Sequence, residues 1–236
     1  MRHCLIGCGN MGSRKSEGDD GLSISTHAKA IHFLKDVDEF VCIDNVLDLA
    51  EEAADKWGAD DYNDEPLAGF DFYTIAVPAD KHLSVVRDIL SHTTPKIIVL
   101  EKPCGFSFYD CKKIIRLCEQ SGTALIVSYQ RRFDKILRYF SDIRQEITIE
   151  CLDDFEHLCH AYDMESWYEG KITLKVVNKT KNSMAFNVYV DGFRVPRSLD
   201  HSLYDFYRYI LDGHSELLCC GSDIIHTHYV NEYGSN

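Results

Sequence analysis

Two groups of residues in this 236-residue sequence have the types and spacing that proton transfer needs. Glu101 and Lys102 precede a proline at the end of the apolar run 97–100, and Glu156 stands four residues before His160. Partial burial can bring the pKa of a lysine towards neutrality, so Lys102 is a candidate to hold or transfer a proton. Four residues span about one helical turn, so Glu156 and His160 would share a helix face as a carboxylate–imidazole pair. A solvated strand end is the commoner explanation of an arbitrary Glu-Lys-Pro, and a polar helix explains the second group equally well.

A glycine-rich turn near the start of the chain is a candidate nucleotide site. It follows apolar residues 4–6 and spells GxGxxG, with Gly7, Gly9, Asn10, Met11 and Gly12 as the candidate cofactor-binding residues. In a strand–turn–helix unit the first glycine permits the tight turn, the second admits a pyrophosphate, and the third lets the helix pack closely. The pyrophosphate would lie on the helix N-terminus. Such turns are common, but this one begins a predicted βαβ unit, which favours a dinucleotide site.

An acidic residue follows the second apolar run. Asp44 comes directly after residues 40–43, where a carboxylate accepts hydrogen bonds from ribose hydroxyls and repels a 2′-phosphate. We therefore expect NAD as the cofactor, with NADP less favoured, although a turn or helix cap explains the aspartate alone as well. The polar segment 13–26 accounts for the long interval from the glycines. It predicts an inserted loop, with a helix starting near His27.

The first half of the chain alternates short apolar runs with amphipathic stretches, which is typical of βαβ units. We expect strands at residues 3–6, 40–43, 72–76, 96–100 and 124–128, and helices at 46–56 and 108–120. Ser107 is the expected N-cap of the second helix, and Gly122 is its expected stop. The fold class predicted for residues 1–128 is α/β, a Rossmann domain with a doubly wound parallel sheet.

The pattern changes after about residue 130. Strands are expected at 147–151, 171–177 and 184–190, with the last two as an antiparallel pair around 178–182, and helices at 202–211 and 222–230. Between Phe133 and Glu156 the chain looks too short for both a strand and a helix. Residues 129–236 are therefore predicted to form a small, reduced α+β domain with an antiparallel sheet for substrate binding or dimerisation.

Composition excludes several classes of function. A net charge of −13 argues against nucleic-acid binding, which needs basic density. The absence of a long apolar run or signal-like segment predicts no membrane partner and a cytoplasmic protein. Ten cysteines without a C-x-x-C pair favour buried, reduced thiols. The histidine pairs 157/160 and 226/228 lack the spacing of a zinc site, so no metal is expected.

Six short motifs occur in one order along the first 134 residues: GCGNMG, HAKAI, CID, FDFYTIAVPADKH, EKP and YQRRFD. In these motifs the chain resembles the glucose–fructose oxidoreductase and inositol dehydrogenase family (Gfo/Idh/MocA), as a shortened member. The resemblance implies a Rossmann domain and a second domain on an open antiparallel sheet. It also implies oxidation or reduction of sugars, inositols or sugar nucleotides with NAD(P).

The resemblance also assigns roles to residues. It implies that Lys102 is the catalytic lysine and that Pro78 and His82 match the loop bordering the nicotinamide side of the cofactor. Glu101, beside Lys102, is a further candidate cofactor-binding residue. The D-x-x-x-H-x-x-D stretch of the family matches Glu156, His160 and Asp163 here, with glutamate in place of the first aspartate. Candidate substrate contacts are Lys102, Arg131, Arg132 and Asp163, the arginines for a nucleotide-sugar phosphate.

Two hypotheses of different class follow. The first is an NAD(P)-dependent oxidoreductase that transfers a hydride to or from a secondary alcohol or ketone of a sugar, cyclitol or nucleotide-sugar. The second is a catalytically idle dinucleotide-binding sensor or assembly partner on the same fold. The expected partner is a small sugar-like molecule, with a homodimer as the candidate assembly.

Overall fold

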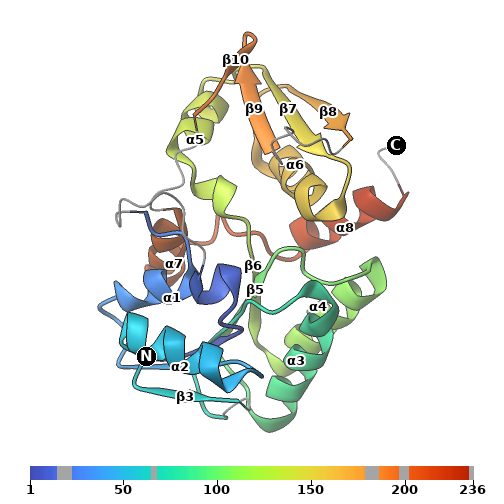
Figure 1. Ribbon diagram of the computed structural model, residues 1–236. Coiled ribbons are helices and arrows are strands. Elements are labelled where there is room, and N and C mark those ends of the chain that lie inside the picture. Colours follow the sequence, from blue (N-terminus) through green and yellow to red (C-terminus); the bar gives the residue numbers. More distant parts are fainter. Residues whose placement is uncertain (15–22, 65–67, 179–185, 197–201, 234–236) are drawn as a thin grey trace.

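The computed structural model describes residues 1–14, 23–64, 68–178, 186–196 and 202–233. Its larger part, at the bottom of Figure 1, contains a six-stranded sheet. The strand order is β3-β2-β1-β4-β5-β6, and every pair is parallel. The strands are β1 (Arg2–Ile6), β2 (Glu39–Ile43), β3 (Asp61–Asn63), β4 (Phe72–Ile75), β5 (Ile97–Glu101) and β6 (Ala124–Ser128). This arrangement confirms the predicted Rossmann fold, and β3 is the strand that the sequence did not reveal.

Helices cover both faces of the parallel sheet, which explains the nearly continuous apolar character of its strands. Cys4 and Ile6 of β1 pack on the side of α3 (Ala79–His92) and α4 (Phe108–Ser121), whereas Leu5 packs on the side of α1 (His27–His32) and α2 (Leu47–Trp57). Successive strand residues point to opposite faces, so one strand serves two cores.

Local signals set the helix ends as predicted. The Ser107 hydroxyl accepts a hydrogen bond from the backbone N–H of Asp110, and Gly122 ends α4 with φ of 74°. α1 begins at His27, where Thr26 provides the N-cap. A short helical turn, η1 (Asn10–Arg14), precedes it, and most of the predicted inserted loop lies outside the described residues.

The second sheet has four strands in the order β10-β9-β7-β8: β7 (Ile147–Leu152), β8 (Ile172–Val177), β9 (Phe186–Val190) and β10 (Phe193–Arg194). The predicted hairpin of β8 with β9 is wrong, because β7 lies between them, antiparallel to β9 and parallel to β8. Helix α6 (Phe155–Trp167) is the crossover that two parallel strands require. The sheet is therefore mixed and not purely antiparallel.

The connection between the two sheets also differs from expectation. After η2 (Gln130–Phe133), the Asp134 carboxylate caps α5 (Lys135–Asp142) by accepting two backbone N–H bonds. Residues 143–146 then lead directly into β7, so a helix and a strand do fit between Phe133 and Glu156. Because Asp134 ends η2 and caps α5 at the same position, no loop is needed between these two elements, and the short segment holds both α5 and β7.

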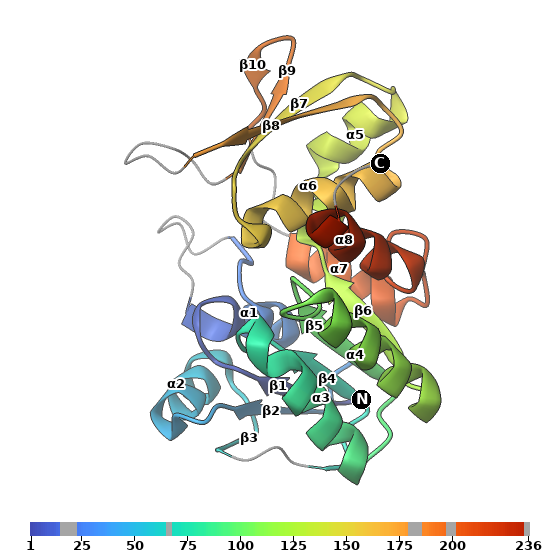
Figure 2. The ribbon, with the colours of Figure 1, turned by 90° about the vertical axis from the view of Figure 1, so that its right-hand side faces the viewer.

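The two C-terminal helices, α7 (Ser202–Leu211) and α8 (Ser222–Tyr233), form where the sequence predicts them. α7 returns to the first domain and packs through Phe206 and Tyr207 on the Rossmann sheet, while α8 lies beside α6 and α4 (Figure 2). The division at residue 128 remains a prediction, since the chain crosses back over it. None of the ten cysteines, all of which lie in the described residues, forms a disulfide, and every one except Cys220 is buried. Among the described residues, no helix has the length and apolar character to cross a membrane.

Candidate functional site

The glycine loop has the shape that a dinucleotide needs. Gly7 has φ of +96°, and a Cβ there would lie 2.7 Å from the carbonyl carbon of Ala76. A Cβ at Gly12 would lie 1.8 Å from the Gly7 oxygen, so both positions require glycine for packing. At Gly9 an added Cβ meets nothing within 4 Å. This open space above the middle glycine fits a pyrophosphate that approaches the main chain.

The Asp44 side chain connects this loop to the end of β2 by hydrogen bonds. One of its carboxylate oxygens accepts the Cys8 N–H at 2.8 Å, and the other accepts the Val46 N–H at 3.0 Å. The carboxylate is largely buried, yet each of its oxygens has a second lone pair for a ribose hydroxyl. Asp44 therefore supports the loop through both of its carboxylate oxygens.

A cleft of about 750 Å³ opens at the carboxyl ends of β1, β4 and β5, where open α/β sheets bind ligands. It brings together six of the twelve predicted cofactor and catalytic positions: Gly9, Asn10, Met11, Pro78, Glu101 and Lys102. The sequence did not single out Phe106, which also lines the cleft and is 72% exposed. A large aromatic residue soon after the Glu-Lys-Pro motif was the signal that the sequence offered.

His82 is buried and is not among the residues that line the cleft, and its place beside the nicotinamide stays a prediction. Its ring nitrogens lie 2.9 Å from the carbonyl oxygen of Val77 and 3.1 Å from that of Cys104. Burial lowers the pKa of His82, so the ring is neutral and donates one hydrogen bond at a time. Its place between two backbone carbonyls makes it a link between the loops that follow β4 and β5.

A chain of buried hydrogen bonds runs from Glu101 through the core. His27 Nε2 lies 2.8 Å from a Glu101 oxygen, and its Nδ1 lies 2.7 Å from the Tyr207 hydroxyl. That hydroxyl lies 2.8 Å from Thr74 Oγ1, which lies 2.9 Å from His3 Nε2. The hydrogen bonds can all be donated in one direction, from His3 to Glu101, so that each of the three groups between them donates one bond and accepts one. The chain thereby selects the His27 tautomer with its proton on Nε2.

These hydrogen bonds help to keep Glu101, which lines the cleft, in its ionised form. Burial alone would raise the pKa of Glu101, but the hydrogen bond from His27 and the charge of Lys102 outweigh it and hold the pKa below its ordinary value. The backbone N–H of Lys102 also donates to the second Glu101 oxygen, at 3.2 Å. An ionised carboxylate therefore lies beside the candidate catalytic lysine.

The second domain brings His160 towards this region. Its ring packs edge-on against Tyr129 and Phe186, each with a centroid separation of 5.8 Å. Tyr129 follows β6, whose Ser128 pairs with Glu101 of β5. Burial raises the pKa of the thiol of Cys159, the residue before His160, and the positive charge of Lys102 partly opposes this rise. Glu156 lies one turn earlier in α6, and its side chain is outside the described part of the structure.

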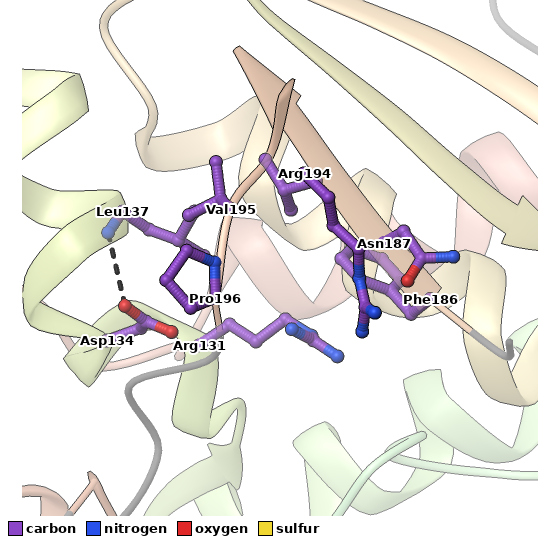
Figure 3. A pocket seen from close by; sticks show the side chains of 9 residues that line it. Arg131, Asp134, Leu137, Phe186, Asn187, Arg194, Val195 and Pro196 are labelled. Atoms are coloured by element: carbon purple, nitrogen blue, oxygen red, sulfur yellow. Dashed lines mark hydrogen bonds between the residues drawn. The ribbon is translucent and has the colours of Figure 1, made fainter. Parts of the chain in front are cut away.

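The two predicted substrate arginines have different surroundings. Arg132 is buried and donates to Asp163 through Nε and Nη2, and through Nη2 to Asp223 at 2.9 Å. These bonds join η2, α6 and α8, so Arg132 and Asp163 are placed for structural support and not towards the cleft. Arg131 instead lines a small pocket with Phe186 (Figure 3). No group of three or more histidine, cysteine or acidic residues suited to a metal occurs among the described residues.

Comparison with known proteins identifies the class. Residues 1–129 match the model of an oxidoreductase family with an NAD-binding Rossmann fold, GFO_IDH_MocA, and the chain belongs to this family. No curated protein matches the chain.

Solved structures extend the likeness over both domains. The UDP-N-acetylglucosamine 3-dehydrogenase GnnA from Acidithiobacillus ferrooxidans is 13% identical, with a TM-score of 0.72 over 99% of this chain and 96% of that chain. The WlbA (WbpB) dehydrogenase from Thermus thermophilus, in complex with NAD and UDP-GlcNAcA, is 14% identical, with a TM-score of 0.68 over 98% and 93%. An oxidoreductase from Agrobacterium radiobacter, in complex with NAD+, L-tartaric acid and magnesium, is 15% identical, with a TM-score of 0.67 over 98% and 94%. At these identities the likeness establishes the fold.

Proposed function

We propose that this protein is an NAD(P)-dependent oxidoreductase that acts on a secondary alcohol or ketone of a sugar, cyclitol or nucleotide-sugar. The observation that carries the proposal is the single cleft that holds the open Gly9 turn at one position and Lys102 at another. Two of the similar structures hold NAD, which supports the same reading of the cleft.

The residues present suit the cofactor. The main chain at Gly9 would approach the pyrophosphate, and the Asp44 carboxylate would accept the ribose hydroxyls. A 2′-phosphate would meet that negative charge, so NAD is the favoured cofactor over NADP. When bound, NAD supplies a hydride acceptor at the nicotinamide C4 atom.

Side chains of the protein accept and release the proton. Oxidation of a CH–OH group releases a hydride from carbon and a proton from oxygen, and Lys102 lies in the cleft to take that proton. His160, with Glu156 one turn before it, is the second proposed acid–base group. The ionised Glu101 beside Lys102 stabilises the positive charge that the lysine gains. A cytoplasmic location and a homodimer are the remaining parts of this proposal.

The alternative is a dinucleotide-binding sensor or assembly partner without turnover. The second sheet has four strands in the part of the chain that the structure describes, which favours this alternative, because a small sheet gives few residues to a substrate pocket. The two functions differ in one test. Lys102→Ala should abolish turnover of a panel of sugars, cyclitols and sugar nucleotides while NADH affinity stays nearly unchanged. Lys112→Ala, on the exposed side of α4, is the matched control. A protein that binds NADH and turns over none of the panel would support the sensor.

A further inference from the structure

A small pocket beside His160 receives two arginine side chains from different elements. Arg131 comes from η2 and Arg194 from β10, and Asn187 of β9 also lines it. Figure 3 shows the two guanidinium groups extending towards the same opening. The enclosed space is about 10 Å³, which is room for about one water-sized atom. One oxygen of a ligand group would therefore fill it, with the rest of the group at the mouth.

The pocket is built from side chains held in place. Arg131 is only 7% exposed, and its guanidinium carbon lies 3.8 Å from the centre of the Phe186 ring. Asn187 is also buried, and its side-chain oxygen has no hydrogen-bond partner among the described residues. A buried polar atom of this kind costs stability until a ligand or water satisfies it. In this orientation the Asn187 oxygen accepts a hydrogen bond, as from a ligand hydroxyl, whereas the turned carboxamide would present its NH2 group as a donor to an anion.

The charges of the pocket favour an anion. A guanidinium has five N–H donors in a planar fork, so it can bind a carboxylate or phosphate alongside protein groups. Asp134 is the one acidic residue in the lining, and one of its oxygens accepts the N–H bonds of Ile136 and Leu137 that begin α5. Two guanidinium groups thus face one opening on a protein whose net charge is −13.

We propose that Arg131, Arg194 and Asn187 form a subsite for a carboxylate or phosphate group of the substrate. The substrate is then an acidic sugar or a phosphate-bearing sugar, and not a neutral polyol. This inference rests on the proposed function and narrows its substrate class. Phe186 links the two parts of the site, because its ring contacts both Arg131 and His160. The anionic group would therefore lie one aromatic ring away from the imidazole.

Calorimetric titration tests the subsite without requiring turnover. The probes are D-glucuronate for a carboxylate, UDP and glucose 1-phosphate for a phosphate, and myo-inositol as the neutral comparison. We expect at least one anionic probe to bind, and Arg194→Gln to weaken it about tenfold, which corresponds to about 1.4 kcal/mol. Arg194 is exposed, so this variant should fold normally, as circular dichroism would show. Arg87→Gln, on the exposed side of α3, removes the same charge elsewhere and should change nothing.

The outcomes separate the subsite from the wider function. Binding of the carboxylate or the phosphate probe alone would identify the source of the anion. Unchanged binding in Arg194→Gln, equal binding of myo-inositol, or no binding of any anionic probe at millimolar concentration would overturn the subsite. A separate NADH titration of the same samples tests the proposed oxidoreductase. NADH binding without anion binding would overturn the subsite alone, and anion binding without NADH binding would overturn the proposed function.

Discussion

The buried hydrogen bonds that connect His3 to Glu101 predict that removing the Tyr207 hydroxyl lowers the stability of the protein. In Tyr207→Phe, His27 Nδ1 loses its donor and Thr74 loses one of its two partners, all within the buried core. A buried polar group left without a partner costs about 1–3 kcal/mol. Thr74 keeps its bond to His3, so the loss falls mainly on His27. We expect Tyr207→Phe to lower the free energy of unfolding by about 1–3 kcal/mol.

Urea unfolding followed by circular dichroism measures this loss. Tyr209→Phe, on the same helix, is the matched control, since the Tyr209 hydroxyl bonds Glu216 at the surface. Surface changes of this kind are usually within about 0.5 kcal/mol. Equal costs for Tyr207→Phe and Tyr209→Phe would refute the view that the chain is a connected, buried network.

Two further predictions concern buried charge. Burial lowers the pKa of His3 from 6.5 to about 3. Between these two values the unfolded chain binds a proton at His3 that the folded protein does not, so stability falls as the pH is lowered. Between pH 7 and pH 5, unfolding free energies should fall about 2 kcal/mol further in the native protein than in His3→Gln; equal slopes would contradict this. Asp163→Asn removes the buried carboxylate that pairs with Arg132 and leaves the guanidinium with Asp223 and the Ser166 hydroxyl, so we expect a loss of about 3 kcal/mol in thermal or urea unfolding. A raised KM without loss of stability would instead restore both residues to the substrate site.

The sequence predicted those features that depend on neighbouring residues. Ser107 and Gly122 mark the ends of α4 through their own backbone and side-chain chemistry, and the glycine turn marks the end of β1 in the same way. β3 was missed because its three residues carry no apolar run. The position of β7 between β8 and β9 could not be read from the chain, since strand order depends on the crossover through α6.

Among the site residues too, those that depend on local motifs were predicted and those that depend on distant contacts were not. Lys102 and the Gly9 turn were found because their motifs are local and lie at strand ends, where the cleft opens. The Arg132–Asp223 bond joins residues 91 apart, and the His27–Tyr207 bond joins residues 180 apart. No local pattern encodes such pairs. The second arginine of the anion pocket, Arg194, was missed for the same reason, because β10 meets η2 only in the folded protein.

The central claim is that the cleft above the glycine turn holds a nicotinamide dinucleotide, and titration with NADH tests it most directly. Nicotinamide fluorescence would be followed in the native protein and in Gly9→Ala, with NADPH as the comparison. An added Cβ at Gly9 meets no protein atom within 4 Å, so the variant should fold normally while its methyl group fills the space for the pyrophosphate. We predict NADH binding that Gly9→Ala weakens at least about tenfold, and weaker binding of NADPH. No binding of NADH, or equal binding by Gly9→Ala, would contradict the account.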